Sequence, residues 1–489
     1  MKYSARAVRD RRKTIKDRCQ TLDQSSYGQF STIYADAIPQ ALFELPSSGP
    51  NSRLRQFTLK VTFFLWLHQI LLGNPACERM VIHARTWLQA IGTLTEKLSS
   101  SAYCQARKRL SVLWLRTMAT AICRSFPPIT KPDPRHLGFN LLVVDGTTFS
   151  LPDTPDNAAV FPLPPGQKPG CGFPVMPVLG LFSLATGGLV DWVAVHYRAH
   201  DCRLFPRLFN SLKTGDLLLA DRAFSSYFNV ASLCQRGVQY VGRLHQARKF
   251  PGAHAKRMGQ DDYLVTWTKG SQAPKHYPQE WQSLPAELQV RLVKYSVAEP
   301  GFRTREVILV TTLLDAQQYP AEQVAELYHL RWQVELNFRD IKLTMNMDHL
   351  TCRTPEMLDK ELLMIIIGYN LIQWLITRDA ISRHRNHDTY SFSNAMSYVA
   401  TIAIKMSILM SMSECRKLYR EYFSDFGAYR HIHRPNRSEV RAVKRRDSNY
   451  KRMNRPRHEM QVEPHRNRHK AAAASPGANA PRHHLLSLT

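Results

Sequence analysis

Residues 320–345 read PAEQVAELYHLRWQVELNFRDIKLTM, with one proline at the start and no glycine. A leading proline followed by an unbroken run predicts a helix. On that helix, side chains at offsets of three, seven and fourteen from the first would share an arc of roughly 60°: Tyr328, Arg331, Glu335 and Lys342. Apolar residues occupy a face centred roughly 90° away: Leu327, Leu330, Val334, Phe338 and Ile341. The pattern predicts a helix that packs on a core and presents a carboxylate flanked by a phenol and two cations.

The same spacing also fits a solvated helix face that carries only an intrahelical arginine–glutamate pair, worth roughly 0.2–0.5 kcal/mol. The acids elsewhere in the chain decide between the two interpretations. Leu141–Val144 and Leu217–Ala220 are short apolar runs, each followed at once by an aspartate, Asp145 and Asp221. Such runs predict buried strands with an acid at the C-terminal end.

Acids at the ends of adjacent strands can meet at one point with a third acid, Glu335, from a helix that crosses the sheet. Three carboxylates so near one another repel each other unless divalent cations neutralise their charge. Mg²⁺ suits such a site because it takes one or two carboxylates and accepts phosphate oxygens as further ligands. Two such ions roughly 4 Å apart serve an in-line displacement at phosphorus. Asp145, Asp221 and Glu335 therefore predict metal-dependent phosphodiester chemistry.

Five other acids compete for this role: Asp153, Asp191, Asp201, Asp216 and Asp340. Asp216 follows a glycine just before a strand, so we expect a turn residue there. Asp340 would point about 150° away from the polar stripe. Asp153 sits between two prolines.

The composition favours a nucleic-acid partner. The chain has 489 residues, with 66 lysines and arginines against 39 acids and a formal charge of +27. An excess this large favours a polyanion, and nucleic acid before a membrane. The nine cysteines form no Cys-x-x-Cys motif, which indicates reduced thiols in an intracellular protein. The most apolar stretches, 61–72 and 362–376, fall short of the roughly 18 residues of a membrane span and predict buried helices.

The pattern along the chain predicts six regions. These are a helical, basic, DNA-binding region (1–135), the first part of a sheet-and-helix core (136–236), a β-rich insertion (237–315), the second part of the core with the helix predicted at 320–345, called the signature helix below (316–385), a helical C-terminal region (386–429) and a basic tail, disordered without nucleic acid (430–489). Strands are expected in the insertion at 238–244, 263–267, 290–295 and 306–313. In the first region, serines before residue 102 cap a predicted helix. Its Gln105, Lys108 and Arg109 form either a DNA-contacting face or a generic basic one.

These residues also carry a family resemblance. Tyr328-x2-Arg331-x3-Glu335-x6-Lys342 matches in full the signature of DDE transposases from bacterial insertion sequences of the family numbered four. Asp145-Gly146-Thr147 resembles the first-aspartate motif of that family. Asp221-Arg222-Ala223-Phe224 resembles the second, in which glycine is more usual than Ala223. The resemblance runs from about residue 50 to about residue 457.

The resemblance implies an α/β fold with an RNase H-like core, interrupted by the β-rich insertion and flanked by helical N- and C-terminal regions. It implies that Asp145, Asp221 and Glu335 hold two Mg²⁺ ions, for which Mn²⁺ can substitute. Tyr328, Arg331 and Lys342 would bind phosphates near the cleaved transposon end. Arg339, on the same helix face, would join them.

The implied reaction is cut-and-paste transposition: a nick frees a 3′-OH at the terminal inverted repeat, and this 3′-OH attacks target DNA. The implied partners are double-stranded DNA, as transposon ends and target, and a second copy of the chain in a synaptic homodimer. The protein would be cytoplasmic in a bacterium, without a membrane, and nucleoid-associated when bound to DNA. Two alternatives stay open, a nuclease without strand transfer and a decayed or domesticated DNA-binding protein.

Some relatives open the second strand through a DNA hairpin, aided by a tryptophan of the insertion that stabilises a flipped base. The comparable strand of this chain, 304–310, has no tryptophan. Trp267 and Trp281 lie elsewhere in the insertion and are expected to pack in its core. The hairpin step is therefore left open.

Overall fold

The computed structural model describes residues 34–44, 57–90, 98–129, 133–164, 172–197, 199–251, 254–296 and 306–408, with scattered positions up to 427. The chain divides into two units, Met1–Pro162 with Pro174–Ala442, and Leu163–Phe173 with Val443–Thr489. All the described helices and strands belong to the first unit. The predicted basic tail, 430–489, and the first 33 residues lie outside the described residues.

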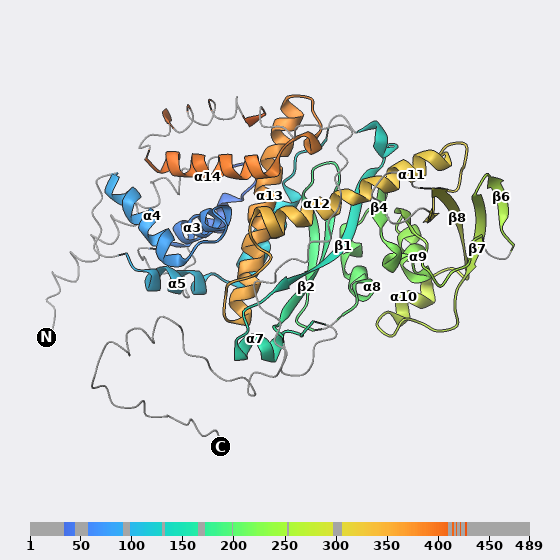
Figure 1. Ribbon diagram of the computed structural model, residues 1–489, viewed down its shortest axis with the longest axis horizontal. Helices are drawn as coiled ribbons and strands as arrows, with labels where there is room; N and C mark the ends of the chain where they lie inside the picture. The colour runs from blue at the N-terminus through green and yellow to red at the C-terminus, as the bar shows by residue number, and fades with distance from the viewer. Residues whose placement is uncertain are drawn as a thin grey trace, which may run out of the picture. The chain divides into compact units, whose positions relative to one another are not determined.

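One mixed sheet organises the first unit (Figure 1). Its nine described strands lie in the order β3-β2-β1-β4-β5-β9-β8-β7-β6. Strand β2 runs antiparallel to β1 and β3, whereas β1, β4 and β5 run parallel. Three antiparallel strands followed by two parallel ones, in this order, form an RNase H-like core, which confirms the predicted fold class. The bounds are β1 Asn140–Ser150, β2 Val175–Ser183, β3 Leu189–Ala194, β4 Asp216–Ala220 and β5 Gln239–Arg243.

The β-rich stretch continues the core sheet. Its strands are β6 Lys256–Gly259, β7 Asp262–Thr268, β8 Glu287–Ser296 and β9 Glu306–Thr311. Strand β9 pairs antiparallel with β5, so hydrogen bonding runs unbroken from core to insertion. All four strands expected at 238–313 are confirmed. Because β5 pairs with β4 inside the core, a boundary after residue 243 fits the sheet better than the predicted boundary at 236, and the domain limits stay predictions.

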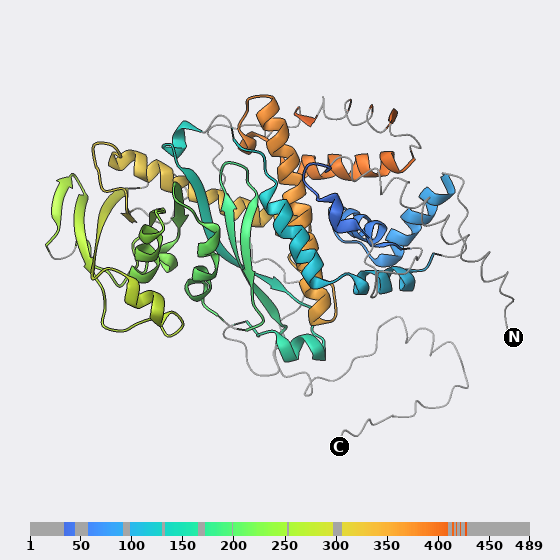
Figure 2. The same cartoon turned by 180° about the vertical axis from the view of Figure 1, so that it is seen from behind.

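Helices cover both faces of the sheet, because alternate side chains of β1 and β4 enter two different apolar clusters. Val143 and Leu219 pack with α3 Leu59–Leu71, α6 Val112–Arg124, α13 Pro355–Ser382 and α14 Phe392–Ile408. Figure 2 shows α6 alongside α13 on this side. Val144 and Leu218 pack against the opposite layer, which includes α9 Tyr227–Gln235 and α10 Pro278–Ser283. The remaining helices are α4 Cys77–Ala90, α5 Ser100–Arg109, α7 Pro155–Val160 and α8 Asp201–Leu204.

Helix α13 is long and apolar enough to cross a membrane by length and composition, and its most apolar stretch is wholly buried. It packs on α3, α6 and α14. Helix α3 is buried along nearly its whole length. The two apolar stretches are thus core helices, as the sequence predicts.

The signature helix is helical throughout but is not one α-helix. It consists of α11 Ala321–His329, a 3₁₀ turn at Leu330–Trp332, α12 Gln333–Arg339 and a π-helical turn at Asp340–Thr344. In the last turn the Met345 N–H bonds to the Asp340 carbonyl at 2.9 Å, five residues back. The prediction of one regular helix is wrong at these two turns, because the backbone hydrogen bonds there shift by one residue.

Candidate active site

Two aspartates and an arginine lie at the same level on three neighbouring parallel strands, just past the last parallel pairs. Asp145 lies within β1, which continues to Ser150 and so does not end at the acid as predicted. The last in-register residues of β1, β4 and β5 are Val144, Ala220 and Gly242. The next residues are Asp145, Asp221 and Arg243. Because neighbouring strands lie about 4.8 Å apart, these three positions form one row across the sheet, where the parallel pairing of the strands ends.

The two aspartates point to the face that α12 covers. Side chains alternate between the faces of a sheet. Two residues before Asp145 and Asp221 are Val143 and Leu219, which pack in the same apolar cluster as Val334 of α12. Asp145 and Asp221 therefore share the face from which α12 presents its own acid.

On this face the charges of Glu335 and Asp221 both act on Asp145. Burial is the main cause that raises the pKa of Asp145 to about 6, and the charges of Glu335 and Asp221 add to it. The Gly146 N–H, 2.9 Å from Asp145 Oδ1, and Arg331 act against the rise. The Glu335 side chain is 41% exposed, and its Oε1 lies 3.1 Å from Arg331 Nη2. The structure thus brings Asp145, Asp221, Glu335 and Arg331 together.

Arg331 is the central cation of the site. Its side chain is 14% exposed, and its guanidinium lies 5.8 Å from the centre of the Tyr328 ring. Burial acts to lower the pKa of Arg331, but Tyr328, Glu335 and the two aspartates raise it overall, so the side chain stays charged. The Tyr328 hydroxyl is buried and has no hydrogen-bond partner among the described residues. A phosphate contact by Tyr328 stays a prediction that needs local movement when DNA binds.

Lys342 and Arg339 differ in their surroundings. The Lys342 ammonium donates to the Thr148 carbonyl of β1 at 2.6 Å and lies 3.4 Å from Asp348 Oδ1. Arg339 is half exposed, with its Nη2 4.0 Å from Asp340 Oδ1. Both stay predicted DNA contacts, and Lys342 must exchange a protein partner for a phosphate to make one.

The rival acids lie in other environments. Asp216 is the first residue of β4 and not a turn residue as expected. Its carboxylate accepts from the Asn140 amide at 2.7 Å and from the Lys213 N–H of the preceding turn at 2.8 Å. The Asp340 carboxylate accepts from the Thr344 hydroxyl at 3.0 Å. The Asp201 carboxyl group packs directly against Gly146 and occupies the space that a Cβ at Gly146 would need.

The donor set fits a hard divalent cation. Among the described residues, no three histidine, cysteine, aspartate or glutamate side chains lie close enough to hold a metal ion together, and Glu335 is engaged by Arg331. The charges of Glu335 and Asp221 nevertheless add to the raised pKa of Asp145, and a divalent cation relieves such repulsion. Carboxylate oxygens are also the ligands that Mg²⁺ prefers. Metal binding by all three acids would require Glu335 to exchange Arg331 for the ion.

Arg243 lies beside the predicted site residues, although the sequence pattern does not single it out. It stands beside Asp221 in the row, and its charge acts on Tyr328 and Tyr295. Its only signal is that a charged residue follows an apolar run, as at the two aspartates. Only the parallel register of β4 and β5 places it in the site.

Helix α5 presents the polar face expected from the sequence. Gln105 and Lys108 are exposed, and Arg109 is half-buried. Arg107, by contrast, is 5% exposed, and its guanidinium lies 3.9 Å from the centre of the Trp66 ring. Arg107 therefore belongs to the core, and the other three residues form the candidate DNA face.

The insertion tryptophans are core residues, as expected. Trp267 and Trp281 are 6% and 9% exposed. The Arg248 guanidinium lies 3.7 Å from the centre of the Trp267 ring. Neither indole is placed to stack on a flipped base without rearrangement.

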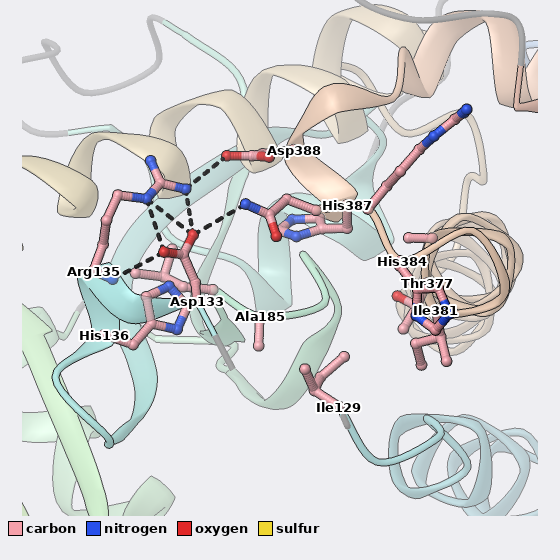
Figure 3. A pocket seen from close by; sticks show the side chains of 14 residues that line it. Ile129, Asp133, Arg135, His136, Ala185, Thr377, Ile381, His384, His387 and Asp388 are labelled. Atoms are coloured by element: carbon pink, nitrogen blue, oxygen red, sulfur yellow. Dashed lines mark hydrogen bonds and ion pairs between the residues drawn. The ribbon is translucent and has the colours of Figure 1, made fainter. Parts of the chain in front are cut away.

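A separate polar cavity of about 90 Å³ lies near the start of β1, at the edge of the sheet opposite to the row (Figure 3). Arg135 joins Asp133 and Asp388 across one wall, at 2.5 and 3.2 Å. His136 and His387 also line it, and burial is the main cause that lowers the pKa of both. This cavity contains none of the predicted site residues.

Comparison with known proteins agrees with the site. Residues 137–371 match the family described as the transposase DDE domain. The chain is 27% identical over 319 residues to the transposase InsG of insertion sequence element IS4 from Escherichia coli K12, covering 64% of this chain and 68% of InsG. It is 26% identical over 211 residues to the transposase of insertion sequence element IS421 from Escherichia coli, covering 35% of this chain and 57% of that protein.

Among solved structures, the chain is similar to the piggyBac transposase synaptic complex with hairpin DNA, with a TM-score of 0.42 at 11% identity over 83% of this chain and 82% of that one. A likeness at that level carries no inference about this chain. The domain match and the similarity to InsG, together with the site geometry, support a transposase with a DDE domain that is similar to the IS4 transposase.

Proposed function

We propose that this transposase binds the terminal inverted repeats of its own insertion sequence and catalyses strand cleavage and strand transfer with Mg²⁺. The observation that carries the proposal is that Asp145 feels the charges of Asp221, Glu335 and Arg331, and that Arg331 is paired with Glu335. A site with three carboxylates and a buried guanidinium can hold a divalent cation and a phosphodiester side by side.

Each residue has a proposed role that follows from its place. Asp145, Asp221 and Glu335 would hold the metal ions, whose chemistry when bound would be to activate the attacking oxygen and stabilise the leaving one. Arg331 presents a planar fork of donors suited to phosphate oxygens. Lys342, at the end of the same helix, binds a phosphate farther along the same DNA strand.

The outer contacts complete the DNA-binding surface. Arg243 extends the row of site residues by one strand, and Arg339 is the most exposed of the cations on the signature helix. Tyr328 contributes its ring beneath Arg331 and its hydroxyl to the same phosphate region. The exposed face of α5 adds contacts to the inverted repeat.

The partners follow from charge and reaction. A formal charge of +27 suits extended contact with duplex DNA, both the transposon ends and the target. We propose that two copies assemble on two ends, because the transposon has two ends to join. The enzyme would act in the bacterial cytoplasm, on nucleoid DNA.

The test uses a short duplex that carries the gene's native flank, a plasmid target and Mg²⁺. Wild type should nick the duplex at the transposon end and join the 3′-OH to the plasmid. Glu335→Gln should bind the duplex and do neither. Glu322→Gln is the matched control on the same helix, outside the polar stripe, and should behave as wild type.

Two outcomes would redirect the proposal. Nicking by wild type without joining would indicate the nuclease without strand transfer. Binding by wild type with no nicking would indicate the decayed or domesticated DNA-binding protein.

A further inference from the structure

Lys342 is anchored between two protein oxygens. Its ammonium donates to the Thr148 carbonyl at 2.6 Å and pairs with Asp348 Oδ1 at 3.4 Å. The side chain of Lys342 is 20% exposed and that of Asp348 is 39% exposed. The second oxygen of Asp348 lies 3.6 Å from His349 Nδ1. The acid is thus partly exposed and contacts both Lys342 and His349.

The backbone fixes Asp348 in this place. After the π-helical turn, the Lys342 carbonyl accepts from the N–H groups of Met347 at 2.9 Å and Asp348 at 3.1 Å. Asn346 takes φ +59°, a left-handed conformation that asparagine tolerates. The Asp348 carbonyl accepts from the Ser150 N–H at 3.1 Å, which ties the turn to the end of β1. These bonds do not use the Asp348 carboxylate, so they survive its replacement by an amide.

The two signature cations share this arrangement. Arg331 is paired with Glu335, and Lys342 with Asp348. A carboxylate and a DNA phosphate offer the same kind of anionic oxygen to an ammonium group, and they compete for it. A phosphate that takes Lys342 therefore has to displace the Asp348 carboxylate.

We propose that Asp348 is a positioning residue that holds Lys342 against β1 in the DNA-free enzyme and gives it up to a phosphate of the bound end. This rests on the proposed function, in which Lys342 contacts DNA. The displaced carboxylate takes up a cation as the phosphate loses one, so the Lys342 contact releases no net counterion. Asp348 thereby weakens the attraction for DNA at this point, and only a duplex held in the right place displaces it.

The experiment measures binding of metal-free enzyme to the native-end duplex over a range of salt concentrations. Asp348→Asn should bind about two- to five-fold more tightly than wild type, the range expected for a partly exposed pair. The slope of log affinity against log salt should steepen by about 0.9, because one further counterion is released. A merely structural role would not change this slope.

Two further variants separate the pairing from a general charge effect. Lys342→Ala should weaken binding, and Lys342→Ala with Asp348→Asn should bind as Lys342→Ala alone, because Asp348 acts through Lys342. Glu326→Gln removes an exposed acid from the same signature helix without touching Lys342 and should leave the slope unchanged. Thermal unfolding of each variant checks that it folds.

The outcomes are distinct. An Asp348→Asn enzyme with wild-type affinity and slope would overturn the inference, and so would a gain in affinity that persists without Lys342. A Lys342→Ala enzyme that binds as wild type would remove the DNA contact on which the inference rests. Failure of wild type to prefer its native end would instead count against the proposed function.

Discussion

Replacing Asp145 by asparagine should make the metal-free transposase more stable at neutral pH while abolishing cleavage. The reason is the environment of the carboxyl group: it is buried beside Glu335 and Asp221, and its pKa is raised from the ordinary 3.8 to about 6. An asparagine has nearly the same shape and can still accept the Gly146 N–H bond. It removes the buried charge at every pH.

The sign and size follow from proton linkage. The native state binds the Asp145 proton more tightly than the unfolded chain does, so the free energy of unfolding falls as pH rises from about 4 to about 6. At 1.36 kcal/mol for each pKa unit, the loss is about 3 kcal/mol and persists above pH 6. The asparagine variant lacks this loss. It should exceed wild type by up to about 3 kcal/mol at pH 8 and by about zero at pH 4.

The assay is urea unfolding of both proteins in EDTA at pH 4, 6 and 8. Asp261→Asn, in an exposed turn with φ +55°, is the control for loss of one negative charge. Adding Mg²⁺ at pH 8 should stabilise wild type and have a smaller effect on Asp145→Asn. An Asp145→Asn protein that is less stable than wild type at pH 8, or a difference that does not vary with pH, would refute the reasoning.

Three other variants test separate parts of the structure. Arg331→Ala should weaken end binding and cleavage, and Arg331→Lys should not restore them because the planar fork is lost; fluorescence anisotropy and a nicking assay measure both, and wild-type values would remove Arg331 from the DNA contacts. Gly146→Ala places a Cβ within 3.0 Å of the Asp201 carboxyl atoms and should reduce cleavage by displacing β1. Adding Asp201→Ala removes the clash and should restore cleavage. A double variant that cleaves as poorly as Gly146→Ala alone would contradict this explanation. Arg291 has a fully buried side chain whose Nη2 lies 2.6 Å from Asp262 Oδ2. Asp262→Ala removes this partner and should lower the free energy of unfolding in urea by about 3–5 kcal/mol. A loss below about 1 kcal/mol would contradict this account of the buried pair.

The strands and their acids could be predicted because the signal is local. The apolar runs before Asp145 and Asp221 specify buried strands, and the structure pairs the two runs in register up to Val144 and Ala220. Strand β1 continues past Asp145 to Ser150, which the apolar run does not reveal. The apolar face of the signature helix also follows from spacing, since Val334 and Phe338 enter the core as expected. The positions of the 3₁₀ and π-helical turns could not be predicted, because a shift of backbone hydrogen bonds by one residue leaves the hydrophobic period almost unchanged.

Two residues near the site, Arg243 and Asp348, could not be predicted because their positions depend on pairing between distant segments of the chain. Arg243 enters the site only through the register of β5 against β4. Asp348 reaches Lys342 only because the backbone turns back after the helix and bonds to Ser150 of β1. The continuation of the insertion in the core sheet through β9 is likewise a pairing of strands more than 60 residues apart along the chain. Periodicity in one segment carries no information on such partners.

The most direct test of the central claim is DNA excision from a plasmid that carries this gene between its native flanks, with wild type beside Glu335→Gln. The claim that Glu335 and the two strand aspartates form the active centre of a transposase predicts excision by wild type and none by the variant, with end binding kept by both. Excision by the Glu335→Gln enzyme at the wild-type rate would contradict it.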